Sequence, residues 1–170
     1  MTLPKTEAPV HSARKLDIEE IKAFMATCSP ETKVYIGCDS ERFKSKGLWY
    51  ADYIIAVVVH VDGRKGARIF GEVRRLPDHD QRKNRPFARM MQETMFVSET
   101  YLALKEVFYD FEVECHLDIN PNENFGSSCA AQAAVGYIRG TCNVVPLLKP
   151  KAFAASYAAD RLKSVTGITA

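Results

Sequence analysis

The sequence predicts an α/β fold on a mixed five-stranded sheet, in which three antiparallel strands are followed by two parallel ones and helices flank the sheet. Three β-type segments follow one another between residues 33 and 73 with short connections, which is typical of an antiparallel meander. Helical and strand spacing then alternate, and a strand–helix–strand segment requires a right-handed parallel crossover. With 170 residues, 46% of them hydrophobic, we expect one domain over residues 16–170 behind a flexible tail of residues 1–15.

A short helix is expected before the sheet. Asp17 and Glu20 have the spacing of a capping box, and apolar residues then recur at helical intervals up to residue 25. Residues 33–38 predict the first strand, which we expect to end at Asp39. Residues 48–61 predict the second strand, and residues 67–73 predict the third after a turn at Asp62 and Gly63.

The second half alternates between helices and strands. Residues 86–109 have broad helical spacing and start at Pro86, which suits a first helical turn. Residues 112–119 alternate as a fourth strand. Ser127 can cap a helix over residues 128–139 that stops at Gly140, and residues 143–148 predict the fifth strand. A last helix is expected from about residue 151 to residue 164.

Composition narrows the functional class only slightly. The formal net charge of +2 neither requires nor excludes a nucleic-acid partner. The longest apolar run, residues 53–59, is far shorter than the roughly 20 residues of a membrane helix, so we expect no membrane partner. The first fifteen residues lack the apolar stretch of a secretory signal, which favours a cytoplasmic protein. Five widely spaced cysteines are an odd number and favour reduced thiols over a disulfide framework.

Four carboxylates fall where they could share one site. Asp39 and Asp118 are expected at the ends of the first and fourth strands, and sites in open α/β sheets form at such carboxyl ends. Glu93 lies on the apolar side of the long helix, where an isolated charge is costly, and Asp160 lies in the last helix. Taken singly, each has an ordinary explanation as a turn, cap or surface residue. Together they are the ligand set for two Mg²⁺ or Mn²⁺ ions that hydrolyse a phosphodiester.

Several segments resemble the bacterial YkuK-type family of ribonuclease H-like proteins. The likeness runs from about residue 33 to residue 162 and is carried by residues 35–40 (YIGCDS), 92–94 (QET), 116–122 (HLDINPN), 149–156 (KPKAFAAS) and 159–162 (ADRL). The resemblance implies a ribonuclease H-like fold, in which acidic residues fall on the first strand, the first long helix, the fourth strand and the last helix. All four positions are acidic here, so it also implies a two-metal nuclease whose catalytic and metal-binding residues are Asp39, Glu93, Asp118 and Asp160.

Basic and polar residues near these segments are candidates for binding nucleic acid, whether RNA, DNA or a hybrid. Residues 64–89 hold nine basic residues against three acidic ones, which could follow a phosphate backbone or simply be a solvated loop. The expected nucleic-acid contacts are Arg74, Arg75, Arg82, Lys83, Arg85, Lys149, Lys151 and Arg161. Residues expected to orient metal ligands, water or phosphate are Ser40, His116, Asn120 and Ser156.

Two alternative functions stay open. A proofreading-type exonuclease is suggested by the Asp-x-Glu pattern at residues 39–41 and by Tyr157 before Asp160, but that branch has three residues between its tyrosine and aspartate and this chain has two. The other alternative is a nucleic-acid-binding module that keeps the fold and the acidic pocket but has weak or no turnover. Metal-dependent cleavage that Asp39→Asn abolishes would separate the nuclease from the module.

Overall fold

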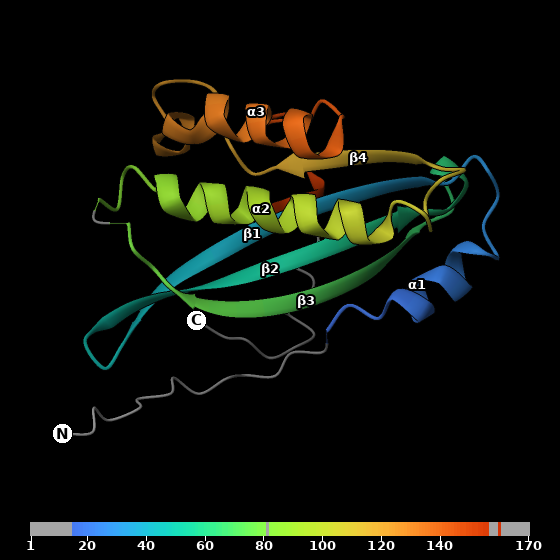
Figure 1. Cartoon of the computed structure of the whole chain (residues 1–170), viewed down its shortest axis with the longest axis horizontal. Helices are drawn as coiled ribbons and strands as arrows, with labels where there is room; N and C mark the ends of the chain where they lie inside the picture. Colours follow the sequence, from blue (N-terminus) through green and yellow to red (C-terminus); the bar gives the residue numbers. More distant parts are fainter. Residues whose placement is uncertain (1–14, 81, 157–159, 161–170) are drawn as a thin grey trace.

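The three-stranded meander is present as predicted. The computed structural model describes residues 15–80, 82–156 and 160, and in it β1 (Lys33–Ser45), β2 (Leu48–His60) and β3 (Ala67–Pro77) pair antiparallel along their lengths. Lys46 and Gly47 have φ values of 48° and 81° and form the tight turn between β1 and β2. A two-residue turn with positive φ matches the twist of the strands it joins. The result is a long hairpin extending from the sheet (Figure 1).

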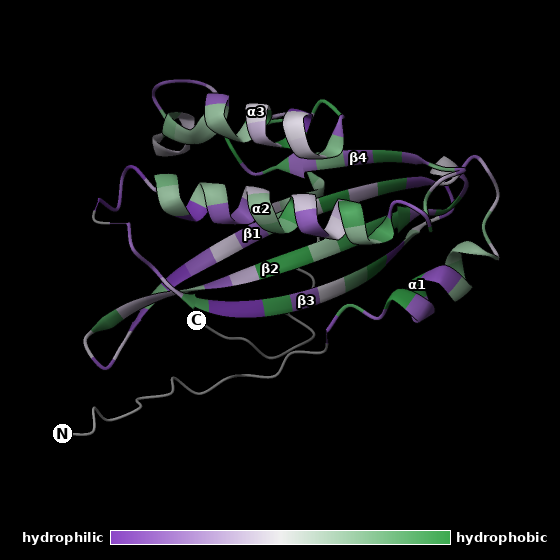
Figure 2. Cartoon of the chain, in the orientation of Figure 1, coloured by the Kyte–Doolittle hydropathy of each residue, from purple (hydrophilic) through white to green (hydrophobic). Residues whose placement is uncertain are grey.

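A fourth strand makes the sheet mixed. β4 (Glu112–Leu117) pairs parallel with β1, so the strand order is β3-β2-β1-β4. Most of β2 lies in the middle of the sheet and is buried residue after residue, and Figure 2 shows it in hydrophobic colours through much of its length. β1 and β2 both continue beyond the end of β4, which leaves one edge of β1 open after Cys38.

Helices cover one face of this sheet. α1 (Ile18–Met25), α2 (Phe87–Leu104) and α3 (Ala131–Cys142), the last preceded by a 3₁₀ turn at Gly126–Ala130, contribute to one apolar core with β1, β2 and β4 (Figure 1). Asp17 caps α1 as predicted, because its carboxylate accepts the backbone N–H groups of Glu19 and Glu20. The opposite face carries a smaller apolar cluster around Tyr35, Val58 and Ala154.

The expected fifth strand is wrong within the described residues, where the sheet has four strands. Only Leu147 forms a bridge to β4, through hydrogen bonds with the backbone of Cys115 and Leu117 at 2.9 Å each. Two residues explain the loss. Asn143 adopts a left-handed conformation (φ 57°) as the C-cap of α3, so the helix runs past the predicted stop at Gly140, and Pro146 has no N–H to donate to a ladder.

The first strand is also longer than predicted, since β1 runs on to Ser45 and Asp39 lies inside it. The last helix is described only at residues 154–156 and 160, which are helical. The rest of that predicted helix, and residues 1–14 of the predicted tail, lie outside the described residues. Among the helices that the structure describes, none is both long and apolar enough to cross a membrane.

Candidate metal and phosphodiester site

Asp39 and Asp118 lie at the point where β1 and β4 separate. The last paired residues of these parallel strands are Cys38 and Leu117, so Asp39 and Asp118 are the next residues in the same register. Neighbouring strands lie about 4.8 Å apart, and residues in register point to the same face of a sheet. The end of β4 therefore brings together two carboxylates that are 79 positions apart in the chain.

Glu93 approaches from α2 and is buried. It is only 3% exposed, its Oε1 accepts a hydrogen bond from the Ser40 hydroxyl, and its Oε2 has no hydrogen-bond partner among the described residues. Burial and the negative charge of Asp39, with a smaller contribution from Asp118, raise the pKa of Glu93 well above its usual range. A buried carboxylate with an unsatisfied oxygen is costly unless a proton neutralises the group or a cation takes that oxygen.

Lys149 provides a positive charge at Asp118. Its Nζ lies 2.5 Å from Asp118 Oδ1, and its backbone N–H donates to the carbonyl oxygen of Ile119 at 3.0 Å. Burial by itself lowers the pKa of Lys149, but the contact with Asp118 and the charges of Asp39 and Glu93 outweigh it, so this pKa is raised. Lys149, two residues after the Leu147 bridge, thus neutralises part of the acidic cluster.

The start of the C-terminal helix packs on the face of β1 to which Gly37 and Asp39 belong. A Cβ atom at Gly37 would lie 2.8 Å from Ala155 Cα, so only glycine permits this approach. His116 is fully buried, and its Nδ1 accepts the backbone N–H of Ala154 at 3.2 Å while its Nε2 lies 2.9 Å from Glu114. These contacts fix the segment that leads to Asp160, which is itself exposed and helical.

The donor chemistry suits a hard divalent cation. Asp39, Glu93 and Asp118 offer carboxylate oxygens, which Mg²⁺ and Mn²⁺ prefer, and one oxygen of Glu93 has no partner among the described residues. Within those residues, however, no group of three or more His, Cys, Asp or Glu side chains is arranged to hold a metal ion. In this arrangement the Lys149 ammonium, rather than a converged set of carboxylates, faces Asp118.

Comparison with known families agrees with the α/β fold described above. A family model described as ribonuclease H-like matches residues 17–164. The chain belongs to the ribonuclease H-like family. The match includes every helix and strand described above and all four acidic positions, although it assigns no role to any residue. The chain has no significant match among curated proteins or among solved structures.

The basic residues of this ribonuclease H-like chain divide into two groups. Arg74 forms ion pairs with Glu72 and Glu99, and Arg75 forms a two-pronged pair with Asp52 with both distances at 2.7 Å. Both arginines thus have structural partners in the described residues. The candidates that are exposed to solvent are Arg82, Lys83, Arg85 and Lys151, and Arg161 lies outside the described residues.

The remaining polar candidates have different surroundings. Ser40 contacts Glu93 directly, whereas the Asn120 side chain accepts the backbone N–H of Asn122 in a turn and the Ser156 hydroxyl contacts the carbonyl oxygen of Phe153. His116 is fully buried, because Ala154 and Phe153 cover its ring. It therefore does not lie in solvent beside Asp118.

Sequence reasoning missed the network that fastens α2 beside the hairpin. Arg42 forms a buried ion pair with Asp78 and donates to the carbonyl oxygen of Asp80 at 3.0 Å. The Asp80 carboxylate accepts the backbone N–H groups of Ala88 and Arg89 at the start of α2. Asp80 lies seven residues before the start of α2. Capping residues are expected next to the first turn of a helix, so no local sequence pattern predicts this cap.

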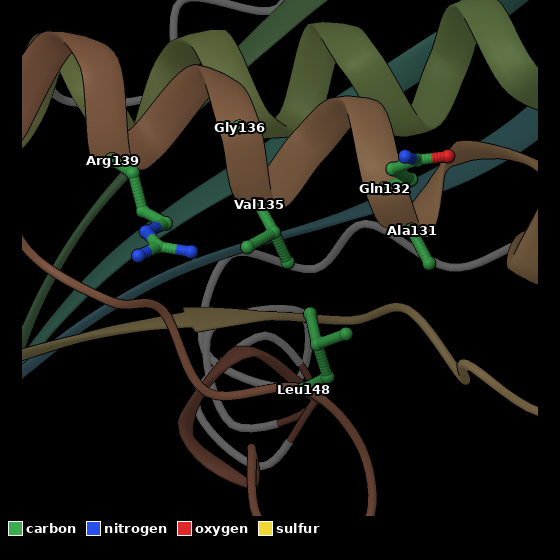
Figure 3. Close-up of a pocket in the computed structure, with 6 residues that line it drawn as sticks. All are labelled: Ala131, Gln132, Val135, Gly136, Arg139 and Leu148. Atoms are coloured by element: carbon green, nitrogen blue, oxygen red, sulfur yellow. The ribbon is translucent and has the colours of Figure 1, made fainter.

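A separate depression of about 430 Å³ lies between α3 and Leu148. Figure 3 shows Ala131, Val135 and Arg139 of α3 directed towards Leu148 across it. Its lining is mostly apolar and includes none of the acidic residues described above. This depression therefore does not overlap the acidic residues at the end of β4.

Proposed function

We propose that the protein is a divalent-metal-dependent nuclease that hydrolyses phosphodiester bonds in a nucleic acid, with Asp39, Glu93 and Asp118 as metal ligands and Asp160 completing the set. The observation that carries the proposal is the buried Glu93 carboxylate. One of its oxygens has no hydrogen-bond partner among the described residues, and its pKa is raised by burial and by the negative charges of Asp39 and Asp118. Membership of the ribonuclease H-like family supports the same reading.

Bound Mg²⁺ or Mn²⁺ ions would activate a water molecule and stabilise the leaving oxygen. The protein's own residues prepare the site. Ser40 donates to one Glu93 oxygen and leaves the other without a hydrogen-bond partner among the described residues. Lys149 holds Asp118 in place when it has no other cation, and its ammonium must give way before Asp118 can bind a metal ion through the same oxygen. Once displaced, that ammonium is available to a substrate phosphate.

The substrate would enter along the exposed basic residues. Arg82, Lys83 and Arg85 precede α2, and Lys151 follows Lys149 near Asp118. Because phosphate contacts supply most sequence-independent affinity for nucleic acids, these exposed cations are better candidates than Arg74 and Arg75, whose charges are already paired.

A second function, a nucleic-acid-binding module with little or no turnover, is favoured by one specific observation. The Lys149 ammonium already neutralises Asp118, so the acidic cluster has a partner without any metal. A site whose charge is balanced internally has a weaker requirement for a divalent ion. The two functions differ in whether a metal displaces this lysine.

The deciding experiment compares the wild type with Asp118→Asn on labelled single-stranded, hybrid and branched substrates, in Mn²⁺, in Mg²⁺ and in chelator. Cleavage only with metal, and only by the wild type, supports the nuclease. Calorimetric titration with Mn²⁺ provides a second measurement that does not depend on finding the substrate. Binding of substrate without any cleavage, together with no uptake of Mn²⁺, would favour the module.

A further inference from the structure

The tip of the β1–β2 hairpin has a composition that the proposed catalytic site does not explain. Residues 42–50 include the chain's single tryptophan and three basic residues but no acidic one. Leu48 and Trp49 are 58% and 42% exposed, and Lys44 and Lys46 are exposed beside them. Figure 1 shows this hairpin projecting beyond the start of α2. The tip therefore presents two large apolar side chains directly beside two exposed cations.

Trp49 is held in position by the two strands. It lies directly opposite Lys44, whose Nζ is 5.7 Å from the centre of the indole ring. The guanidinium carbon of Arg42 is 4.0 Å from that centre. Arg42 is itself fixed by its ion pair with Asp78 and its hydrogen bond to the Asp80 carbonyl oxygen. The ring therefore rests against an anchored guanidinium and still keeps a large part of its surface in solvent.

The same face of β1 leads from this ring to Glu93. Ser40, Arg42 and Lys44 are two residues apart and so point to one side of the strand. Ser40 contacts Glu93, and at about 3.3 Å per residue the Lys44–Trp49 pair lies roughly 13 Å further along. Asp80 is bonded both to Arg42 and to the first turn of α2. The spacing between Trp49 and Glu93 is thus set by rigid elements.

The exposed basic loop continues this surface. The backbone N–H of Asp78 donates to the carbonyl oxygen of Trp49 at 2.9 Å, so the segment that leads to Arg82, Lys83 and Arg85 starts beside the ring. Aromatic rings accept any base by stacking, and cations beside them neutralise the connecting phosphates. Duplex bases are already stacked on one another, so this combination fits a single strand.

We propose that the hairpin tip, defined by Arg42, Lys44, Lys46, Leu48 and Trp49, binds single-stranded nucleic acid, with one base stacked on Trp49 and phosphates beside Lys44 and Lys46. The inference rests on the proposed nuclease function only for what happens to the strand after binding. It names the substrate class of the acidic site as single-stranded DNA or RNA, or a single-stranded extension of a duplex.

Trp49 itself reports the binding, because it is the chain's single tryptophan. The full chain carrying Asp118→Asn, in chelator, is titrated with oligothymidylate, with oligouridylate and with a blunt duplex of the same length while tryptophan fluorescence is followed. We expect quenching by the single strands and little change with the duplex. A difference between the two strands would identify which of the two nucleic acids is preferred.

Variants then measure the contribution of each group by anisotropy of a labelled single strand. Trp49→Ala should weaken binding roughly 5- to 150-fold, which is the range for loss of one stacked base, and Trp49→Phe should lose less because it keeps a ring. Changing Lys44 and Lys46 to alanine should lower the slope of log affinity against log salt by about 1.4, at roughly 0.7 for each phosphate contact. Tyr109→Ala is the matched control, since Tyr109 is 83% exposed beyond the far end of α2.

Three results would overturn the proposal. One is unchanged fluorescence with every strand, another is equal affinity of Trp49→Ala and Tyr109→Ala, and the third is a duplex that quenches as strongly as a single strand. Cleavage by the wild type in Mn²⁺ tests the nuclease proposal separately. Wild-type cleavage without quenching would remove the hairpin proposal alone, whereas quenching without wild-type cleavage in Mn²⁺ would support the hairpin and count against the nuclease.

Discussion

Replacing Gly37 by alanine should loosen the C-terminal segment that leads to Asp160. An added Cβ would lie 2.8 Å from Ala155 Cα and 2.9 Å from both its Cβ and its backbone nitrogen. Carbon atoms pack best at roughly 3.5 to 4.0 Å, so the segment must move away by about 0.7 Å or more. Two of the three close atoms belong to the backbone, which cannot turn aside as a long side chain could.

The expected cost is about 1–3 kcal/mol of the free energy of unfolding, the range for an overpacked core position. For a chain of this length, a loss of 1 kcal/mol lowers the melting temperature by roughly 2–4 °C. Metal-dependent cleavage should fall more steeply than stability, because a shift of about 1 Å in a catalytic group can cost roughly 100-fold in rate. Urea denaturation in chelator and the cleavage rate in Mn²⁺ measure the two effects.

Gly136→Ala is the matched control. Gly136 lies in α3, a Cβ there would meet nothing within 4 Å, and the same change should stabilise the protein by about 0.5–1 kcal/mol through helix propensity. The two alanine substitutions should therefore have opposite signs. If Gly37→Ala is as stable and as active as the wild type, the C-terminal segment does not pack on β1 and our placement of Asp160 fails.

Three further perturbations test the site. Burial and the charge of Asp39 raise the pKa of Glu93 in the folded state, so the stability it contributes is fully present below its unfolded pKa of about 4.3 and is lost as pH rises through the folded value. Glu93→Gln should therefore flatten the pH dependence of the metal-free stability above the unfolded pKa in urea denaturation, and a slope equal to that of the wild type would contradict this. Lys149→Met should tighten Mn²⁺ binding roughly tenfold in calorimetry, because the ion no longer breaks the contact with Asp118, and weaker binding would show that the lysine supports the site instead. Gly126→Ala would place a Cβ 2.1 Å from the Asn84 carbonyl oxygen, so it should displace the basic loop and weaken strand binding by anisotropy, whereas unchanged affinity would exclude that loop from the interface.

Local patterns were sufficient for most of the fold. Runs of β-type residues with turn signals predicted the first three strands, and alternation predicted the fourth. Helical spacing and capping residues predicted α1, α2 and α3 near their observed positions. The fifth strand failed because its ladder depends on two single residues, Asn143 with its left-handed backbone and Pro146 without an N–H. The predicted length of β1 was wrong, because pairing with β2 extends this strand through a polar sequence to Ser45.

Sequence also selected the acidic residues, since a charged side chain on an apolar helix face or after a buried strand is conspicuous without coordinates. The environment of each one needed the tertiary structure. Only the register of β1 with β4 places Asp39 and Asp118 one residue beyond the last paired positions of the two strands, and only packing buries Glu93 against Ser40. The pairing of Arg74 and Arg75 with acidic partners could not be read from a cluster of basic residues.

The sequence by itself determined the class of the protein, an α/β chain of the ribonuclease H-like family. Tertiary structure decided what surrounds the acidic residues, including Lys149 at Asp118. It also decided that Trp49 is anchored by Arg42 on the same face of the sheet as Ser40. The reason is physical. Periodicity and propensity act between residues a few positions apart, whereas the pKa of a buried acid and the partner of a cation are set by groups that only folding brings within a few ångströms.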